Sequence, residues 1–409
     1  MKKLSILSIL LIALYIISRI YIWRSGPVSF TEIIFSYMPY AHLWASGQRP
    51  YLDQWYEYPP ATIPLFYIPH VIDRGTLKYP AIHLDYLQSY RGILLLVDIG
   101  VFVMIWKVLR KQKAKVSIFA GGLVYYILAT AKAHHFLYDS MDLTFAAAMT
   151  LGAASPLLFS SKKVSTFFSW LGYFLAIALK YINAPLGWIY VLLQRKSFKK
   201  TVIFGTIAFL LVWLLPLAYF RSSLSVSFVY HNMRGLQIDT AGATVVRTID
   251  TFTRSEEVIN IYKNFEMKGP VTRQVLKVLN IIFPVSILAF LLYSTFLILK
   301  SPEKNYAKLS IQLTLSYVLL FMLVGKVLST PFLIWHILLL ALYPFESFKQ
   351  QLFFTIPSLL ILGVSMIVVP FFMVGPLTSY IVSAWVRTLL FLYLFIASLI
   401  MLRKKSGAL

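Results

Sequence analysis

The sequence contains no cysteine and few charged residues. Of its 409 residues, 13% are charged and 7 are histidine, whereas about a quarter of a soluble domain is charged. The absence of cysteine excludes disulfides, thiolate nucleophiles and metal sites built on cysteine. The low charge content, together with 59% hydrophobic residues, excludes a soluble enzyme.

The chain instead has a series of long apolar runs. A helix that crosses the hydrocarbon layer needs about 20 apolar residues. Roughly 11–12 segments come close to this length, and several are short enough to be tilted or broken. The sequence therefore predicts an all-α polytopic membrane protein. The predicted segments are 4–23, 90–108, 116–131, 143–159, a broken pair over 164–193, 202–220, 275–299, 309–324, 331–344, 352–372 and 379–402.

Basic residues outnumber acidic residues by 38 to 15, which gives a formal charge of +23. They gather between the apolar runs, at 110–115, 162–163, 195–200 and 403–405. Because Lys and Arg are retained in the cytoplasm, these clusters indicate topology and not nucleic-acid binding. With the N-terminus inside, every acidic residue except Asp98, Glu303 and Glu346 is extracytoplasmic. We therefore predict a multi-pass protein of the cell membrane with its active site on the extracytoplasmic face.

Two polar segments are long enough to build a site on that face. They cover 24–89 and 221–274, and both mix aromatic, proline and apolar residues with charged ones, which is not typical of disorder. The stretch 77–90 fits an amphipathic helix at the membrane surface. We expect a single integral-membrane domain over residues 1–409.

Glu32 is a candidate catalytic base. It follows the first apolar run, where a carboxylate can face a cavity at the membrane surface. A sugar hydroxyl becomes a good nucleophile when a carboxylate removes its proton. The alternative is that Glu32 caps a short helix or pairs with an arginine. Asp53 and Glu57, in the same segment, are rival candidates for the base.

Cationic residues interrupt or flank the later apolar runs. Lys180 lies inside 164–193, where an ammonium group either reaches the interface or meets a lipid-linked phosphate. Arg234 can bind a phosphate with two hydrogen bonds and His231 can add another, although an ordinary polar loop would look the same. Lys326 and Trp335 either anchor a helix at the interface or line a cavity.

One group of residues resembles a metal site at first sight. His134, His135, Asp139 and Asp142 lie between two apolar runs, but their spacing matches no tight pattern of metal ligands. Capping of the helix that begins near residue 143 explains Asp139 or Asp142 equally well. We expect no metal and no cofactor.

Several blocks of the sequence resemble the polyprenyl-phosphate-mannose-dependent mannosyltransferases of glycosyltransferase family 87, which are C-type glycosyltransferases. The longest block is Tyr-His-Asn-Met-Arg-Gly-Leu-Gln-Ile-Asp-Thr at 230–240, where the family has Tyr-His-x-x-Arg-Gly-Leu-Gln-Ile-Glu-Ser. The first outer segment has an acid, Glu32, before Tyr37, and ends in a Glu-Tyr-Pro-Pro run; the family has an Asp before the tyrosine. Lys326 to Trp335 resembles the family's Lys-Val-x-Ser-Pro-Gln-Tyr-x-x-Trp, with Thr-Pro-Phe in place of Pro-Gln-Tyr.

This resemblance implies a GT-C-like bundle with two long extracytoplasmic loops. It implies transfer of a hexose, mannose in the resembling enzymes, from a polyprenyl-phosphate donor to a lipid-linked or glycan acceptor, with inversion. Nucleotide sugars do not reach an outer site unaided, whereas a polyprenyl phosphate partitions into the membrane. The expected partners are this donor, the acceptor and membrane lipids, with no nucleic acid. Glu32 is the expected base, and the expected substrate-binding residues are Tyr37, Tyr51, Asp53, Glu57, Tyr58, Asp142, Lys180, His231, Arg234, Gln237, Asp239, Lys326 and Trp335.

The alternative function is a lipid or polysaccharide flippase or transporter. Such a protein would need charged residues throughout the depth of the membrane, to line a passage. In this chain most of the acidic residues gather on one side of the predicted spans.

Overall fold

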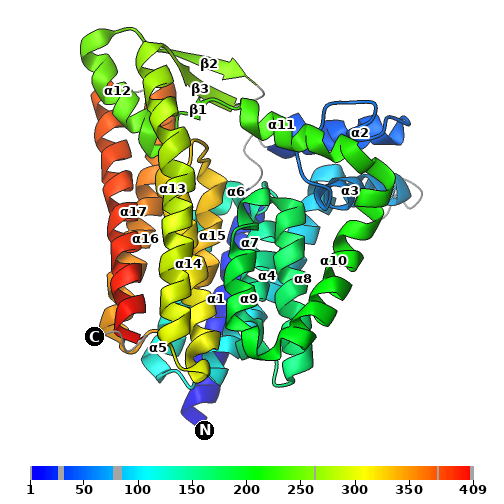
Figure 1. Ribbon diagram of the computed structural model, residues 1–409, viewed down its shortest axis with the longest axis vertical. Helices are drawn as coiled ribbons and strands as arrows, with labels where there is room; N and C mark the ends of the chain where they lie inside the picture. The colour runs from blue at the N-terminus through cyan, green and yellow to red at the C-terminus, as the bar shows by residue number, and fades with distance from the viewer. Residues whose placement is uncertain (1, 26–31, 77–84, 262–263, 375–376, 406–409) are drawn as a thin grey trace. The chain divides into compact units, whose positions relative to one another are not determined.

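The computed structural model describes residues 2–25, 32–76, 85–261, 264–374 and 377–405. The chain forms two compact units, Met1–Asn232 and Met233–Leu409 (Figure 1). Of the predicted surface helix at 77–90, residues 77–84 lie outside the described part, and residues 86–90 belong to the start of a long helix. A single catalytic domain over 1–409 stays a prediction.

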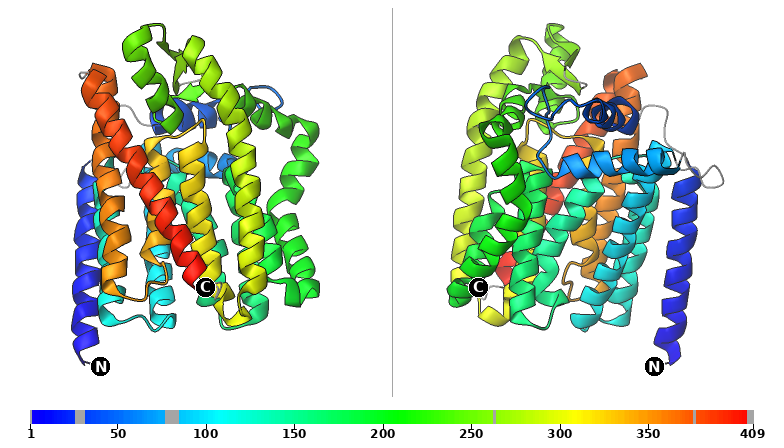
Figure 2. Two further views of the ribbon diagram at one scale, coloured as in Figure 1. Left: turned by 60° about the vertical axis from the view of Figure 1, so that its left-hand side comes forward. Right: turned by 90° about the vertical axis from the view of Figure 1, so that its right-hand side faces the viewer.

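The first unit consists of helices. In its upper part α2 and α3 lie across the ends of the long helices of this unit (Figure 2). Its elements are α1 (Lys2–Arg24), a π-helix (Ile33–Tyr37), α2 (Met38–Ala45), α3 (Thr62–Thr76), α4 (Tyr86–Lys111), α5 (Val116–Lys132), α6 (His134–Leu137), α7 (Asp142–Leu158), α8 (Lys162–Leu179), α9 (Leu186–Leu193), α10 (Phe198–Phe220) and α11 (Ser225–Met233), with 3₁₀ turns at Tyr181–Asn183, Arg195–Ser197 and Arg221–Leu224.

The predicted break within 164–193 is confirmed. Helix α8 ends at Leu179, and Lys180 is extended, with φ −153° and ψ 125°. A proline, Pro185, stands at the N-cap of α9, where the missing N–H of proline costs nothing. Because α8 stops here, the carbonyl of Ala178 is available to accept a hydrogen bond from the backbone N–H of Ala61 at 2.8 Å. The break therefore ties the end of the first outer segment to the helical bundle.

The two ends of the first unit differ in charge. Lys111, at the end of α4, donates hydrogen bonds to the carbonyl of Leu158 at 2.7 Å and to the hydroxyl of Ser160 at 3.2 Å. These bonds place the basic clusters 110–115 and 162–163 at one end of the helices. Asp142 begins α7 and Asp85 caps the start of α4, so acidic residues lie at the opposite end.

A buried ion pair joins α1 to α4 inside this unit. The carboxylate of Asp98, which has no exposed surface, accepts two hydrogen bonds from Arg19, at 2.7 and 2.8 Å. The hydroxyls of Tyr15 and Tyr138 donate to the same carboxylate at 2.9 and 2.7 Å, and Tyr126 also donates to it. Tyr138 begins the turn that leads into α7, so this network fixes the position of that turn.

The second unit combines long helices with a small sheet. Three antiparallel strands have the order β1-β3-β2. The sheet and α12 lie at the ends of α13 and α17 (Figure 1). The elements are β1 (Leu236–Gln237), α12 (Ala241–Thr253), β2 (Glu257–Ile261), β3 (Asn264–Lys268), α13 (Pro270–Lys300), α14 (Tyr306–Val324), α15 (Leu333–Ala341), α16 (Phe348–Val374) and α17 (Leu377–Lys405), with 3₁₀ turns at Glu303–Asn305 and Thr330–Phe332.

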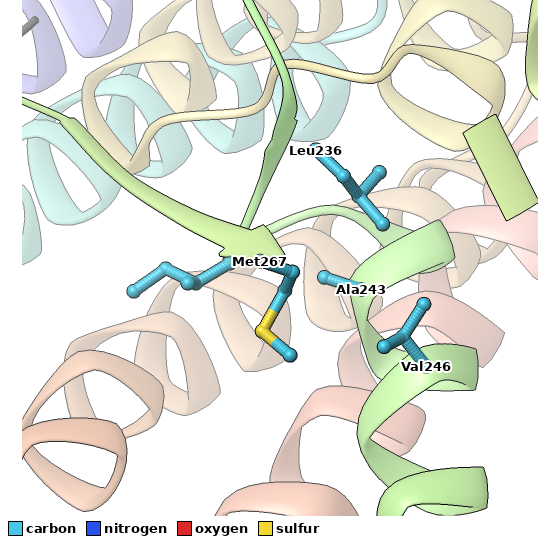
Figure 3. Packing of buried hydrophobic residues seen from close by; sticks show 5 residues of the cluster. Leu236, Ala243, Val246 and Met267 are labelled. Carbon is cyan, nitrogen blue, oxygen red and sulfur yellow. The ribbon is translucent and has the colours of Figure 1, made fainter. Parts of the chain in front are cut away.

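An apolar cluster holds the sheet against α12. Figure 3 shows Leu236 of β1 and Met267 of β3 facing Ala243 and Val246 of the helix. All four side chains are buried, as is Ile238. Leu236 and Met267 are opposite each other in the strand register, so one cross-strand pair sets both the register and the packing of the helix.

Seven helical segments of the described chain are long and apolar enough to cross a membrane, by length and composition. They are Ile6–Arg24, Tyr86–Lys111, Arg195–Met233, Pro270–Lys300, Glu303–Val324, Phe348–Val368 and Leu377–Arg403, and shorter apolar helices cover Val116–Lys132, Asp142–Leu158 and Thr330–Ala341. The predicted all-α polytopic architecture is confirmed. The three-stranded sheet within 221–274 is a feature that the sequence did not indicate, because its strands are two and five residues long.

Candidate functional site

Glu32 is an exposed residue whose carboxylate is hydrogen-bonded to a buried tyrosine. It precedes the π-helix, and its side chain does not cap that helix. It accepts a hydrogen bond from the hydroxyl of Tyr37. Tyr37 has no exposed surface, and its ring stacks on Phe66 with 4.0 Å between centroids. Burial and the negative charge of Glu32 raise the pKa of Tyr37 well above its usual value, so the phenol stays a neutral donor.

The turn before α7 packs against the same tyrosine. The backbone N–H of Met141 donates to the Tyr37 hydroxyl at 3.3 Å. Asp142 is buried in this turn, where the hydroxyl of Ser140 donates to its carboxylate at 2.5 Å. The first outer segment and the turn that carries Asp139 and Asp142 therefore meet at one phenol.

Lys180 pairs with Asp142. Its ammonium lies 2.8 Å from the carboxylate, and the two side chains are 17% and 2% exposed. Lys180 is the extended residue that follows the end of α8, and its side chain reaches Asp142 from this break in the helix. The structure thus brings the predicted residues Asp142 and Lys180 together.

Glu57 contacts a tyrosine that belongs to a cluster of aromatic rings. It is buried and accepts a hydrogen bond from the hydroxyl of Tyr40. Burial, followed by the charge of Glu57, raises the pKa of Tyr40. Tyr58 packs its ring near Tyr37, at 5.9 Å, and Tyr51 donates a hydrogen bond to the carbonyl of Tyr58. Tyr51 has a positive φ of 63°, which is costly for a tyrosine and marks a conformation that its surroundings impose.

Asp53 is engaged at the surface. It forms an ion pair with Arg49, four residues earlier, with 2.8 Å between Nε and Oδ2. Hydrogen bonds from Arg49 lower the pKa of Asp53 to about 2. A carboxylate with so low a pKa is a weak base, so this contact disfavours Asp53 as the residue that activates an acceptor.

The second unit contains a separate cluster of charges. Arg234 lies 3.8 Å from Glu266, measured from Nε to Oε1, and both side chains are less than a tenth exposed. Lys326 is partly buried, and its carbonyl accepts a hydrogen bond from the backbone N–H of Gln237 at 3.0 Å. Burial lowers the pKa of Lys326, Glu266 raises it and Arg234 lowers it further. The predicted residues Arg234, Gln237 and Lys326 therefore come together around Glu266.

The remaining predicted residues occupy different surroundings. Asp239 is buried, and Arg387 of α17 reaches both its side chain at 3.3 Å and its carbonyl at 2.5 Å. Trp335 is 1% exposed and stacks on Phe332 with 4.2 Å between centroids. His231, in the first unit, is exposed and lies against the ring of Tyr230, with 5.4 Å between ring centroids.

Within the described residues, no group of three His, Asp or Glu side chains could hold a metal ion.

Asp139 is a buried carboxylate in the turn before α7. Its carboxylate is buried and lies 3.3 Å from Arg91, yet neither oxygen accepts a hydrogen bond from the described residues. Burial raises the pKa of Asp139 to about 6, although Arg91 acts in the opposite direction. The carboxyl of Asp139 therefore titrates close to neutral pH.

This pKa predicts that stability falls as the pH rises from about 4 to about 6. The folded chain holds the Asp139 proton more tightly than the unfolded chain, so the stabilisation is complete below the unfolded pKa and is lost through the folded pKa. The change amounts to about 3 kcal/mol at most. Thermal unfolding in detergent at several pH values measures it. Asp139→Asn is expected to remove this component, and an unchanged pH dependence in that variant would refute the assignment.

Several residues of these clusters were not predicted as site residues. Glu266 and Arg387 become neighbours of Arg234 and Asp239 through contacts between residues 32 and 148 positions apart, which a single sequence does not reveal. Asp139 was considered only as a metal ligand or a helix cap, and the sequence gave no indication that Arg91 or Tyr40 belongs to the site. The ion pair of Arg49 and Asp53 could have been predicted, because the two residues are four positions apart.

Comparisons with known proteins give a likeness to solved structures and no family match. No protein-family model matches the chain, and no curated protein matches it. The chain is similar to the crystal structure of ArnT from Cupriavidus metallidurans bound to undecaprenyl phosphate, with 14% identity and a TM-score of 0.48 over 100% of this chain and 79% of that chain. The apo structure of the same protein gives 12% identity and a TM-score of 0.47, over 97% and 77%. A likeness at this level transfers no activity to the present chain.

Proposed function

We propose that this chain is a membrane glycosyltransferase that uses a polyprenyl-phosphate sugar as donor. The observation that carries the proposal is the exposed carboxylate of Glu32, which the buried hydroxyl of Tyr37 orients. Such a carboxylate can accept the proton of a sugar hydroxyl during its attack. The rival candidates for the base are less suited, since Glu57 and Asp142 are buried and Asp53 is paired with Arg49.

The donor phosphate is assigned to the cluster around Arg234 and Lys326. Both are cations on the same unit, and guanidinium and ammonium groups stabilise the negative charge that develops on a departing phosphate. Lys180 is engaged by Asp142, which suits a role in holding the turn next to Tyr37. Its predicted contact with the phosphate stays a prediction, as do those of His231, Gln237, Asp239 and Trp335 with the substrates.

The reaction is a single displacement. The acceptor oxygen attacks the anomeric carbon, its proton passes to Glu32, and the bond from that carbon to the phosphate oxygen breaks with the electron pair leaving on the phosphate. The configuration at the anomeric carbon is inverted. The resemblance to family 87 suggests mannose as the sugar and a GT-C-like fold. The positive-inside rule suggests the extracytoplasmic face as the side on which transfer occurs.

Transport of a lipid or polysaccharide is the second candidate function. It is favoured by one observation, the buried pair of Arg19 and Asp98 inside the first unit, because ionisable groups at membrane depth often mark a pathway. However, Asp98 is fully occupied by Arg19 and three tyrosines, and this suits a structural role better.

Reconstituted protein distinguishes the two functions. Purified protein in liposomes is supplied with a polyprenyl-phosphate hexose and lipid acceptors extracted from membranes, and products are analysed by mass spectrometry. We expect a covalent hexosyl product together with free polyprenyl phosphate. Movement of lipid across the bilayer without any covalent product would contradict the proposal and favour the transporter.

A further inference from the structure

Two buried oxygen atoms on the small sheet accept no hydrogen bond from the described residues. They are Oε1 of Glu266, on the central strand β3, and Oε1 of Gln237, on β1. The two residues are 4% and 7% exposed. Burying an acceptor without a donor is unfavourable, and folded proteins rarely leave such atoms unpaired. The two oxygens therefore point to a bound group that donates hydrogen bonds.

The strand register places the two acceptors side by side. Gln237 and Glu266 are direct partners in the antiparallel pair of β1 and β3. The side chains of such a pair lie on the same face of the sheet, with Cβ atoms about 5 Å apart. Because side chains alternate between the faces, this is the face opposite to that of Leu236 and Met267, which pack on α12 (Figure 3). One face of the sheet thus holds the helix, and the other face carries two neighbouring acceptors.

The backbone fixes both acceptors in place. Oε2 of Glu266 accepts a hydrogen bond from the N–H of Gly235 at 2.9 Å. A Cβ atom at position 235 would lie 2.6 Å from that oxygen, so the close approach requires glycine. The N–H of Gln237 donates to the carbonyl of Lys326 at 3.0 Å, which ties β1 to the segment after α14. With Oε2 engaged, Oε1 is the oxygen of Glu266 that is left for a ligand.

A cation adjoins these acceptors. Nε of Arg234 lies 3.8 Å from Oε1 of Glu266, which is too long for a hydrogen bond. Arg234 is one of the residues to which the donor phosphate is assigned above. A guanidinium beside two oxygen acceptors is complementary to a group that combines an anion with hydroxyl donors. A sugar phosphate has this combination, whereas a lipid phosphate without a sugar has no sugar hydroxyl to donate.

We propose that Glu266 and Gln237 bind two adjacent hydroxyls of the hexose that the lipid phosphate carries, the 2-hydroxyl on Glu266 and the 3-hydroxyl on Gln237. This inference rests on the proposed function, because it takes a polyprenyl-phosphate hexose as the ligand. The anomeric carbon is bonded to a phosphate oxygen, and the 2-hydroxyl is on the next carbon. A phosphate on Arg234 therefore places the 2-hydroxyl next to Glu266. The pair of acceptors selects the sugar-bearing donor over the spent carrier.

The wild type gives a test that does not depend on any variant. Binding to the purified protein in detergent at pH 7.5 is measured for polyprenyl-phosphate hexose, its 2-deoxy analogue and polyprenyl phosphate. We expect the hexose donor to bind about tenfold to a hundredfold more tightly than the 2-deoxy analogue, since a hydrogen bond to a charged group contributes this much. Equal affinities for the hexose donor and the 2-deoxy analogue would overturn the proposal.

The Glu266→Gln variant tests the residue that accepts from the 2-hydroxyl. Glutamine keeps an oxygen that can accept the Gly235 hydrogen bond, but a neutral acceptor forms a weaker hydrogen bond than a carboxylate. The preference for the hexose donor over the 2-deoxy analogue is expected to fall to about threefold or less. This ratio cancels any effect of the variant on the phosphate, which both lipids share. A ratio equal to that of the wild type would overturn the proposal.

The Gln237→Met variant tests the second acceptor. Methionine is of similar length and has no amide oxygen. We expect the hexose donor and the 2-deoxy analogue to bind about fivefold more weakly, as is usual for a neutral hydrogen bond, and polyprenyl phosphate to bind as before. Equal weakening of all three lipids by Gln237→Met or by Glu266→Gln would mean that the two acceptors hold an internal water only, and would overturn the proposal.

Glu257→Gln is the matched control for Glu266→Gln. Glu257 is on the adjacent strand β2, its side chain is 63% exposed, and it pairs with Lys268 at the surface. The chemical change is the same, but we expect none of the three affinities to change, because solvent screens an exposed charge. A loss of the preference for the hexose donor in this variant as well would overturn the assignment to Glu266.

The outcomes separate this inference from the proposed function. If none of the three lipids binds to the wild type, the proposed function fails, and the inference fails with it. If all three lipids bind with equal affinity, the recognition of sugar hydroxyls fails while a lipid-phosphate site, and with it the proposed function, stands.

Discussion

Glu32→Gln is expected to lower the rate of sugar transfer by about 10² to 10⁴, the contribution typical of a general base. Glutamine can still accept the hydrogen bond from Tyr37, so the local structure is retained while the ability to take a proton is lost. Transfer from a polyprenyl-phosphate hexose to acceptor lipid is measured by mass spectrometry. Thermal unfolding in detergent is expected to match that of the wild type.

A control makes the same chemical change away from this site. Glu303→Gln alters an exposed residue in the turn before α14 and is expected to leave transfer unchanged. Tyr37→Phe should have a smaller effect than Glu32→Gln, because it removes the group that orients the base and leaves the base itself. Full activity of Glu32→Gln would contradict the assignment and move the base to Glu57, Asp53 or Asp142.

The second large effect concerns stability. Asp98→Ala is expected to destabilise the protein by about 3–5 kcal/mol, as is usual when one partner of a buried ion pair is removed. The substitution leaves the guanidinium of Arg19 buried without its carboxylate, and three tyrosine hydroxyls lose their acceptor. Thermal unfolding in detergent measures the loss. Arg19→Ala is expected to act in the same direction, since it leaves Asp98 without its cation.

An exposed ion pair is the natural comparison for that experiment. Arg49→Ala breaks a pair whose side chains are 56% and 34% exposed, and we expect almost no change in the unfolding temperature, because solvent and salt screen such pairs. If Asp98→Ala were as stable as Arg49→Ala, the network that joins α1 to α4 would not hold the first unit together.

The sequence predicted the elements whose signal is local. Long apolar runs predicted the spanning helices, and Lys180 with Pro185 predicted the break between α8 and α9. The sheet escaped prediction because Leu236 pairs with Met267, 31 positions away, and β1 is only two residues long. A strand that short carries no periodicity.

The site was predictable in part for the same reason. Tyr37 and Glu32 are five residues apart, so the sequence places them in one segment, but their contact depends on the π-helix at Ile33–Tyr37, which the sequence did not indicate. The partners of Asp142, Arg234 and Asp239 depend on tertiary contacts with Lys180, Glu266 and Arg387. The roles of these residues toward a substrate stay predictions until the variants above are measured.

The proposed function depends most on one claim, that a lipid phosphate binds at the cations Arg234 and Lys326 of the second unit. A cryo-electron microscopy structure with bound polyprenyl phosphate tests it most directly. The claim predicts phosphate oxygens at hydrogen-bond distance from Arg234 and Lys326. A phosphate bound away from both cations would contradict the claim.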